Sequence, residues 1–505
     1  MSVERHLLHG KITYSQAKDE EVNIVHQLGY CSRRNDFFGF IRARRSLIEK
    51  KVAHHLKVSS NSCHAADIDS WMHGSFNLCV PVEVEDFGHV IIRFPLPYRV
   101  GDSFYSGNSD EKITCEAGTY AWMYQCCPNI PIPRLHGFAL KSGQGFTTLQ
   151  RSPLFRRLLH RSYCWLLSLL GYPAPSNFIR DDDKVGNELG PYMILDYIKE
   201  GKMLSTTWAQ LKSQEILREN LFRDISKVML TMSRVKLPRI GSFIIDENGY
   251  LLLVNRPLTL MLHDLENENI SVDMPRDRTF STVDSYVNNL LMCHDNRLRF
   301  QPNAVKTGSD CVSQMTALAL MRTVRPHYFD SQLNDGPFVF GLTDLHASNI
   351  FVDENWRIKC LIDLEWAASL PIEFMRPPIW LTSQAVDEID IDEYDGMRQD
   401  FMSIFEEEEE RSCLPEYSLR RTRIMEKGWG LGTFWYGTAL RSPTALHAIF
   451  YDRIQPSYSE KHAKDTNFYL IVSRYWGREP AAFIRSRLED KAAYDVKLRE
   501  MFGRI

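Results

Sequence analysis

GPFVFGLTDLHASNIFVD, residues 336–353, is the stretch that decides the fold expected for this chain. It is followed directly by ENWRIKCLIDLEW, residues 354–366. Asp344 precedes Asn349 by five residues, and a second acid, Asp363, comes fourteen residues after Asn349 at the end of an apolar run. An aspartate and an asparagine at this spacing are common by chance. A further aspartate directly after an apolar strand makes the pattern much rarer, so these three side chains are the first candidates for a functional site.

Two short strands are predicted at residues 350–352 and 360–362, joined by a turn. Such a hairpin would hold Asn349 and Asp363 at one rim. Phosphoryl transfer from a nucleotide needs this kind of set: a carboxylate that accepts the proton of the attacking hydroxyl, and an asparagine and an aspartate that hold Mg²⁺ on the phosphates. Hard oxygen ligands suit Mg²⁺, and no thiolate or imidazole is required.

The structural alternative is that Asp344, His346 and Asn349 only cap a turn, and that Asp363 starts a helix. Other catalytic classes lack residues to carry them. The sequence contains no Gly-x-Ser-x-Gly elbow, no His-Glu-x-x-His helix and no Walker-type phosphate loop. Hydrolase, zinc-protease and P-loop interpretations are therefore disfavoured.

Residues 342–353 together with 361–366 resemble the catalytic and metal segments of the aminoglycoside phosphotransferase (phosphotransferase enzyme) family, and most of all its fungal branch. That family has the protein-kinase-like fold. The resemblance implies that Asp344 is the catalytic base and that Asn349 and Asp363 bind Mg²⁺. One departure is that the family often has His-Gly just before the base, where Leu342 and Thr343 stand here.

A candidate phosphate-binding region precedes this stretch. A Gly-containing turn between two strands can bring backbone N–H groups over phosphate oxygens, and the resemblance places the family's glycine loop at Gly74, Ser75, Phe76 and Asn77. Arg93, on the next predicted strand, stands where a kinase-like fold expects a lysine on the α and β phosphates; arginine is a bulkier, forked donor. Glu116, on a helix predicted over 110–125, could pair with Arg93. A generic hairpin, an exposed strand arginine and a solvated glutamate are the alternatives.

The strand predicted over residues 191–198 corresponds to the hinge between the lobes of a kinase-like fold. There the backbone of Leu195, Asp196, Tyr197 and Ile198 would hydrogen-bond the adenine edge of ATP. A plain core strand is the alternative.

The fold expected from these segments is α+β and protein-kinase-like, with a small, mostly antiparallel β N-lobe and a larger, mainly helical C-lobe. We expect a helical N-terminal extension over 1–65, packed on the first lobe, an N-lobe over 66–200 and a C-lobe over 201–505 with a helical C-terminal part. An insertion is expected at about 143–190. Within it, residues 155–170 suggest an amphipathic helix, for which packing on the protein surface is preferred to membrane contact.

Composition agrees with a globular protein. The chain has 505 residues, 44% hydrophobic and 11% aromatic content, and a net charge of −4. This charge gives no bulk attraction to nucleic acid or to an acidic membrane. Eleven cysteines without zinc-like spacing, and an N-terminus without a secretory signal, indicate free thiols and a cytoplasmic location. The longest apolar run, 164–171, is too short to span a bilayer.

The function expected is that of an ATP- and Mg²⁺-dependent phosphotransferase acting on a hydroxyl of a small molecule. Glu365 and Trp366 replace the glycine that follows the metal-binding aspartate of protein kinases, which disfavours a peptide-docking platform. These two residues and Asp295 suggest a cationic acceptor. A catalytically silent pseudokinase that acts as a binding or scaffold protein is the main alternative, and a protein kinase is the third. The identity of the acceptor and the oligomeric state stay open.

Overall fold

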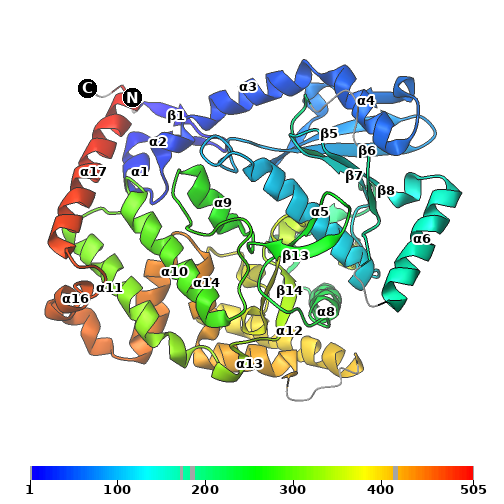
Figure 1. Ribbon diagram of the computed structural model, residues 1–505. Helices are drawn as coiled ribbons and strands as arrows, with labels where there is room; N and C mark the ends of the chain where they lie inside the picture. Colours follow the sequence, from blue (N-terminus) through cyan, green and yellow to red (C-terminus); the bar gives the residue numbers. More distant parts are fainter. Residues whose placement is uncertain (1–2, 171–173, 182–187, 413–418, 504–505) are drawn as a thin grey trace.

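The computed structural model describes residues 3–170, 174–181, 188–412 and 419–503. Two lobes lie one above the other in Figure 1, a sheet-containing lobe formed by the first part of the chain and a larger helical lobe formed by the rest. The expected insertion is partly outside this description, because residues 171–173 and 182–187 are not covered.

The N-lobe is built on one antiparallel sheet. Its strand order is β3 (Cys63–Ala65), β5 (Asn77–Val84), β6 (Gly88–Pro95), β10 (Tyr192–Asp196), β7 (Leu135–Ala139), β8 (Gly145–Thr148) and β9 (Phe178–Arg180), with β4 (Met72–His73) also pairing β5. Leu78, Val80, Val82 and Val84 alternate along β5 and are all buried. This period of two is what fixes the register of a strand with one face in a core.

Helix α5 (Asn108–Cys126) covers the sheet and reaches the C-lobe. It packs closely on β12 (Ser242–Ile245), which forms a hairpin with β13 (Leu251–Asn255) around a turn at 247–249. A Cβ at Gly118 would lie 2.3 Å from the carbonyl oxygen of Phe243. Only glycine permits this close approach of helix and strand.

The chain leaves the N-lobe after β10 and enters the C-lobe through β11 (Lys202–Met203). That strand pairs with β15 (Ile350–Val352), which pairs in turn with β16 (Ile358–Leu361). A second pair, β14 (Phe338–Leu342) with β17 (Ala367–Pro371), flanks the same region. The predicted hairpin of the 336–366 stretch is therefore present.

The rest of the C-lobe is helical. Its helices are α7 (Trp208–Leu211), α8 (Glu215–Met232), α9 (Leu260–Asn267), α10 (Val283–Phe300), α11 (Gly308–Val324), α12 (Ile391–Arg411), α13 (Arg421–Leu431), α14 (Thr433–Arg441), α15 (Leu446–Ile449) and α16 (Thr466–Ser473). In the described part of the chain, none of the helices combines the length and the apolar character needed to cross a membrane.

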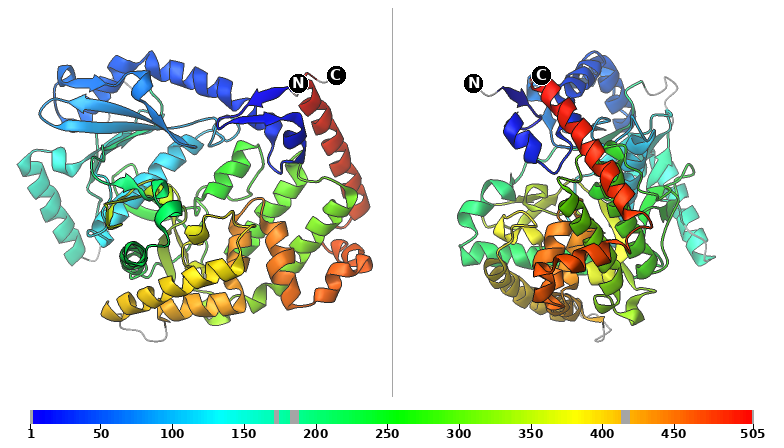
Figure 2. Two further views of the ribbon diagram at one scale, coloured as in Figure 1. Left: turned by 180° about the vertical axis from the view of Figure 1, so that it is seen from behind. Right: turned by 90° about the vertical axis from the view of Figure 1, so that its left-hand side faces the viewer.

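The first 65 residues do not pack on the N-lobe alone. Helix α4 (Arg45–Leu56) lies against the N-lobe sheet, with α3 (Tyr30–Arg42) leading to it. By contrast α1 (Tyr14–Asp19) and α2 (Ile24–Gln27) pack against the C-terminal helix α17 (Pro480–Met501). Figure 2 shows α17 running up to the N-terminal segment, where Arg5 Nε donates to the Met501 carbonyl at 2.6 Å. The expectation of packing on the first lobe holds for only part of this segment.

One antiparallel sheet with its covering helix α5, a short crossing after β10 and a mainly helical second lobe make up the two-lobed, protein-kinase-like α+β fold. This fold class agrees with the expectation from the sequence.

We predict that Leu498→Ala loosens the junction between the chain ends. Leu498 is fully buried in a small cluster with Ile12, Ile24 and Phe502, and deletion of a buried leucine side chain costs about 2–5 kcal/mol. Hydrogen exchange should show faster opening of residues 12–28, and chemical denaturation a lower free energy of unfolding. Leu488→Ala, on the exposed side of α17, is the matched control; an equal effect of both variants would contradict the assignment.

Candidate active site

Asp344 lies in a loop that its neighbours hold from both sides. The loop leaves β14, passes through a 3₁₀ turn at Ala347–Asn349 and enters β15. The backbone N–H of Thr343 donates to the Trp366 carbonyl at 2.8 Å, and the Asn349 side-chain Nδ2 donates to the Asp344 carbonyl at 2.9 Å. Since the amide nitrogen of Asn349 is used in this bond, its Oδ1 is the atom left for a cation.

The β15–β16 hairpin brings Asn349 and Asp363 to the same end. Ile350 pairs with Leu361, and the N–H of Ile362 donates to the Asn349 carbonyl at 3.0 Å. Asp363 follows directly with φ of +54°, a left-handed conformation that is uncommon for a residue other than glycine. Asp363 does not start a helix, so that part of the structural alternative is wrong. Strained conformations of this kind are often kept at functional sites.

Arg93 joins this rim to the N-lobe. Its Nη1 donates to Asp363 Oδ1 at 2.6 Å, and its Nη2 forms an ion pair with Glu116 on α5. The Arg93 and Glu116 side chains are 5% and 0% exposed. Burial alone would lower the pKa of Arg93, but the carboxylates of Glu116 and Asp363 raise it well above its usual value. The predicted pairing of Arg93 with Glu116 is present, and Arg93 is no exposed strand residue.

Burial disfavours the ionised forms of the two acids that contact Arg93, Glu116 and Asp363. Burial raises the pKa of Glu116, and Arg93 offsets this only in part. Burial likewise raises the pKa of Asp363 against the effect of Arg93. Arg93 contacts only Oδ1 of Asp363. The Asp363 side chain is 34% exposed, and its Oδ2 has no hydrogen-bond partner among the described residues. A cation at the rim would therefore find a carboxylate oxygen whose ionised form it stabilises.

Lys112 forms a second buried ion pair that the sequence did not reveal. It lies one helical turn before Glu116 on α5, is completely buried, and contacts Glu365 Oε2. Its Nζ also donates to Asn77 Oδ1 at 2.6 Å, while Asn77 Nδ2 donates to Glu365 Oε2 at 2.7 Å. Burial would raise the pKa of Glu365, but Lys112 and then Arg93 hold that pKa below its usual value.

The turn at Gly74–Asn77 folds over the Asp363 segment. The N–H of Gly74 donates to the Asn77 carbonyl at 3.0 Å, which closes the turn between β4 and β5. Phe76 packs edge-on against Trp366 with ring centroids 5.5 Å apart, and the Ser75 carbonyl accepts from Arg99 Nε at 2.9 Å. The predicted loop thus lies next to the predicted metal-binding segment, with the Asn77 side chain turned inward.

The predicted hinge residues lie where the chain passes between the lobes. Leu195 and Asp196 belong to β10, between β6 and β7, and use their backbone in the sheet. Asp196 also accepts from His136 Nε2 at 2.7 Å. Tyr197 and Ile198 follow the last paired residue, so these two are the ones whose backbone is placed to meet a ligand at the crossing.

Two further side chains, those of His346 and Asp264, interact electrostatically with Asp344. His346 Nε2 lies 3.4 Å from Asp344 Oδ1, and this bond raises the pKa of His346. Asp264, on α9, is half-buried and has no hydrogen-bond or ion-pair partner among the described residues. Burial raises its pKa to about 6, Arg99 opposes this, and the Asp344 carboxylate raises it further. In the sequence, His346 is a candidate only as a turn-capping residue, and Asp264 carries no signal.

The three residues expected to attract a cationic acceptor do not form an acceptor site. Glu365 and Trp366 are buried beneath the cleft, beside Lys112. Asp295 lies within α10, where it pairs with Arg322 and accepts from Trp476 Nε1 at 2.7 Å. These three residues therefore give no reason to expect a cationic acceptor.

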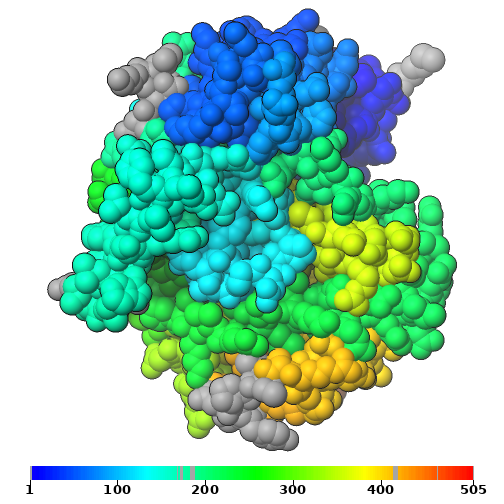
Figure 3. Space-filling view, turned by 90° about the vertical axis from the view of Figure 1, so that its right-hand side faces the viewer, coloured from blue at the N-terminus to red at the C-terminus, as the bar shows by residue number. Residues whose placement is uncertain are grey.

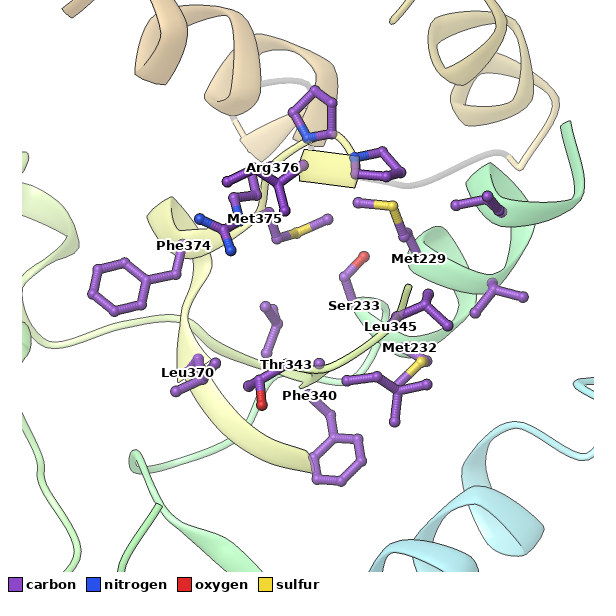
Figure 4. Close-up of a pocket in the computed structure, with 18 of the residues that line it drawn as sticks. Met229, Met232, Ser233, Phe340, Thr343, Leu345, Leu370, Phe374, Met375 and Arg376 are labelled. Atoms are coloured by element: carbon purple, nitrogen blue, oxygen red, sulfur yellow. The ribbon is translucent and has the colours of Figure 1, made fainter. Parts of the chain in front are cut away.

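A separate apolar hollow of about 150 Å³ lies behind the Asp344 loop. Figure 4 shows Met229 and Met232 from α8 facing Phe340, Leu370 and Phe374 across it. Thr343 and Leu345 line it, whereas Asp344 does not. The Asp344 side chain is therefore not part of this hollow.

The donor set fits Mg²⁺ held jointly with phosphate. Among the described residues there is no cluster of three or more His, Cys, Asp or Glu side chains able to hold a metal alone. Asn349 and Asp363 supply two hard oxygens at one rim, and Mg²⁺ in phosphotransferases is commonly bound by one or two protein ligands plus substrate phosphates and water.

We predict that Lys112→Met lowers the free energy of unfolding by about 3–5 kcal/mol, because it leaves the Glu365 carboxylate buried without its main partner. Urea denaturation measures this loss. In the wild type, the lowered pKa of Glu365 gives stability that is present above the unfolded pKa and lost on acidification. The variant lacks that contribution. The difference in the free energy of unfolding between the wild type and the variant should therefore become smaller as the pH falls.

The double variant Lys112→Met/Glu365→Gln is the control for this prediction. It removes both charges and should recover much of the lost stability. A double variant as unstable as Lys112→Met would show that packing around Lys112, and not its charge, is what matters.

Comparisons with known proteins give remote similarity only. No protein-family model matches the sequence, and no curated protein matches it. Among solved structures, a thermostable mutant of the aminoglycoside phosphotransferase APH(4)-Ia, in ternary complex with AMP-PNP and hygromycin B, is similar at 10% identity and a TM-score of 0.35, over 87% of this chain and 94% of that one. The apoenzyme of the macrolide 2′-phosphotransferase MphH from Brachybacterium faecium is similar at 11% identity and a TM-score of 0.31, over 80% of this chain and 95% of that one. Similarity at this level does not assign the chain to a family.

Proposed function

We propose that this protein is an ATP- and Mg²⁺-dependent phosphotransferase that phosphorylates a hydroxyl of a small molecule. The observation that carries the proposal is the convergence of Asp344, Asn349 and Asp363 at one rim, beneath the buried pair of Arg93 and Glu116. The loop at Gly74–Asn77 closes the same rim from above.

In this proposal each residue has a distinct task. Asp344 orients the acceptor hydroxyl and accepts its proton, and His346 holds that carboxylate in place. Asn349 and Asp363 hold Mg²⁺, which neutralises charge on the phosphates. Arg93, fixed by Glu116, presents a permanent cation to them. Catalysis by such a site comes mostly from positioning and charge neutralisation.

The nucleotide would lie between the lobes. Its phosphates would meet the turn at Gly74–Asn77, and its base would meet the crossing after β10. Of the four hinge candidates, Tyr197 and Ile198 are favoured for backbone contacts with adenine, because Leu195 and Asp196 already use theirs in the sheet.

A catalytically silent pseudokinase remains the second candidate. Arg93 replaces the usual lysine, and its guanidinium is already engaged by Glu116 and Asp363. Such a protein would bind nucleotide, or none, and act as a scaffold. The free oxygens of Asn349 and Asp363 favour the enzyme instead, because a scaffold has no need of them.

We predict that Asp344→Asn and Asp363→Asn fail in different ways. Asp344→Asn should keep thermal stabilisation by Mg·ATP but lose turnover by about 10²–10⁴-fold, the usual contribution of a general base. Asp363→Asn should lose both, since it removes a metal ligand. The measurements are thermal shift with Mg·ATP, with and without EDTA, and ATP consumption in a screen of alcohols and amino alcohols.

Glu354→Gln, an exposed change on the same hairpin, is the control and should behave as wild type. Wild-type activity of Asp363→Asn would reject the proposed site. Stabilisation by Mg·ATP without turnover of any hydroxyl compound would favour the pseudokinase.

Asp264 gives a reason to propose a cationic acceptor. Its carboxylate lacks a hydrogen-bond or ion-pair partner in the described structure, and its pKa is raised to about 6 by burial and then by Asp344, against the effect of Arg99. An ammonium group on the acceptor would supply the missing positive charge.

We predict that Asp264→Asn raises KM for the acceptor and leaves KM for ATP unchanged. With wild-type protein, the acceptor KM should rise as the pH falls below about 6, since protonation removes the charge that binds the cation. With Asp264→Asn this rise should be absent. A neutral acceptor, or an unchanged pH profile in the variant, would contradict the role given to Asp264.

A further inference from the structure

Helix α6 (Leu154–Leu169) exposes an unusual amount of apolar surface. Helix α6 and the next residue carry nine of the 27 large hydrophobic side chains that are exposed among the described residues. These nine are 49–73% exposed, and they include Phe155, Leu158, Trp165 and Leu169. The expectation that this helix packs its apolar face on the protein surface is wrong, because that face points outward.

The orientation of α6 is set by its other side. Among the α6 side chains that the structure describes, the partly covered ones are those of Arg157, His160, Cys164 and Leu167. Cys164 Sγ contacts the Pro175 carbonyl at 3.9 Å, and Pro175 forms a bridge with Tyr250 at the end of the β12–β13 hairpin. Figures 1 and 2 place α6 at the edge of the molecule far from α17, and Figure 3 shows this region on the outer face. The apolar face is therefore accessible to a large flat partner.

Charge on α6 is entirely positive. Arg156, Arg157 and Arg161 lie on the helix, and residues 151–180 contain no aspartate or glutamate. With about 3.6 residues per turn, the exposed apolar side chains span an arc of about 180°. Arg156 and Arg161, both exposed, fall at the two borders of that arc. Long cationic side chains at the borders of an apolar face can reach phosphate groups while the apolar residues enter the acyl region.

We propose that α6 docks this protein on the surface of a membrane that contains anionic lipids. The helix would lie in the interface plane, with Phe155, Leu158 and Leu169 in the acyl boundary and Trp165 and Tyr163 in the interfacial layer, which aromatic side chains favour. Each arginine near the surface adds to the attraction of this basic segment to an anionic leaflet. The proposal is independent of the catalytic function argued above.

A second copy of the chain fits the same face less well. Pairing two α6 helices through this face would bring Arg156 and Arg161 of one copy close to those of the other, with no acid on either helix to offset them. An anionic lipid surface supplies the complementary charge.

The test uses the full chain and co-sedimentation with vesicles of phosphatidylcholine alone or of phosphatidylcholine with phosphatidylserine. We expect binding to the phosphatidylserine vesicles that weakens as salt is raised, because screening reduces the attraction of exposed charges. Leu158→Glu/Trp165→Glu should lower the partition coefficient by at least about tenfold, since it places acids in the apolar face. Arg156→Gln/Arg161→Gln should lose most of the preference for phosphatidylserine.

Leu470→Gln/Ile471→Gln is the matched control, because these two residues of α16 are also exposed, at 53% and 59%. Its binding should equal that of wild type, and all variants should keep the wild-type melting temperature. If the wild-type protein binds neither kind of vesicle, the proposal is wrong. Binding that Leu158→Glu/Trp165→Glu leaves intact would also contradict it. Sedimentation velocity gives the remaining outcome: self-association that this variant abolishes, without vesicle binding, would assign the face to a second copy.

Discussion

The buried charges around Arg93 hold the candidate site together. Arg93 comes from the N-lobe sheet, Glu116 and Lys112 from one face of α5, and Asp363 and Glu365 from the segment after β16. Three carboxylates meet two cations here, so the cluster tolerates a further positive charge better than a further negative one. Separating any of these elements would leave a charge unpaired in a region with little water, which is far more costly than losing a surface ion pair. The position of α5 is consequently tied to the conformation of Asp363.

The local parts of the site could be predicted from the sequence. Asn349 and Asp363 flank two short apolar strands, and a hairpin leaves little choice about where its ends lie. The Arg93–Glu116 pair also follows from a strand and a helix of recognisable pattern. Each of these inferences rests on residues whose neighbours in sequence determine their place, or on the resemblance to a family with a known order of elements.

The remaining parts depend on tertiary packing, which no local pattern encodes. Lys112 looks like any other polar residue near the start of a helix, and its burial results from the rotation of α5 against the Trp366 segment. Asp264 interacts with Asp344 because of the tertiary position of α9, which packs beside Trp366 through His263. The acidic run at 406–410 has the composition of a solvated helix face, yet Glu408 and Glu409 are buried. Glu408 pairs with Arg223, and Glu409 accepts from the Thr422 hydroxyl. A run of like charges does not reveal which of its members will find a partner from another helix.

The N-terminal segment links the two lobes a second time. Residues near Val22 accept hydrogen bonds from Gln301 and Asn303 of the helical lobe, whereas α4 lies on the sheet of the other lobe. If the lobes were joined only at the crossing after β10, they could separate widely by a hinge motion at that single connection. The second connection restrains such wide opening. The lobes can then move relative to each other mainly by rotation about the line that joins the two connections. Ligand entry would then depend on small rotations and loop movements, and the length of α3 would set how far the lobes can separate.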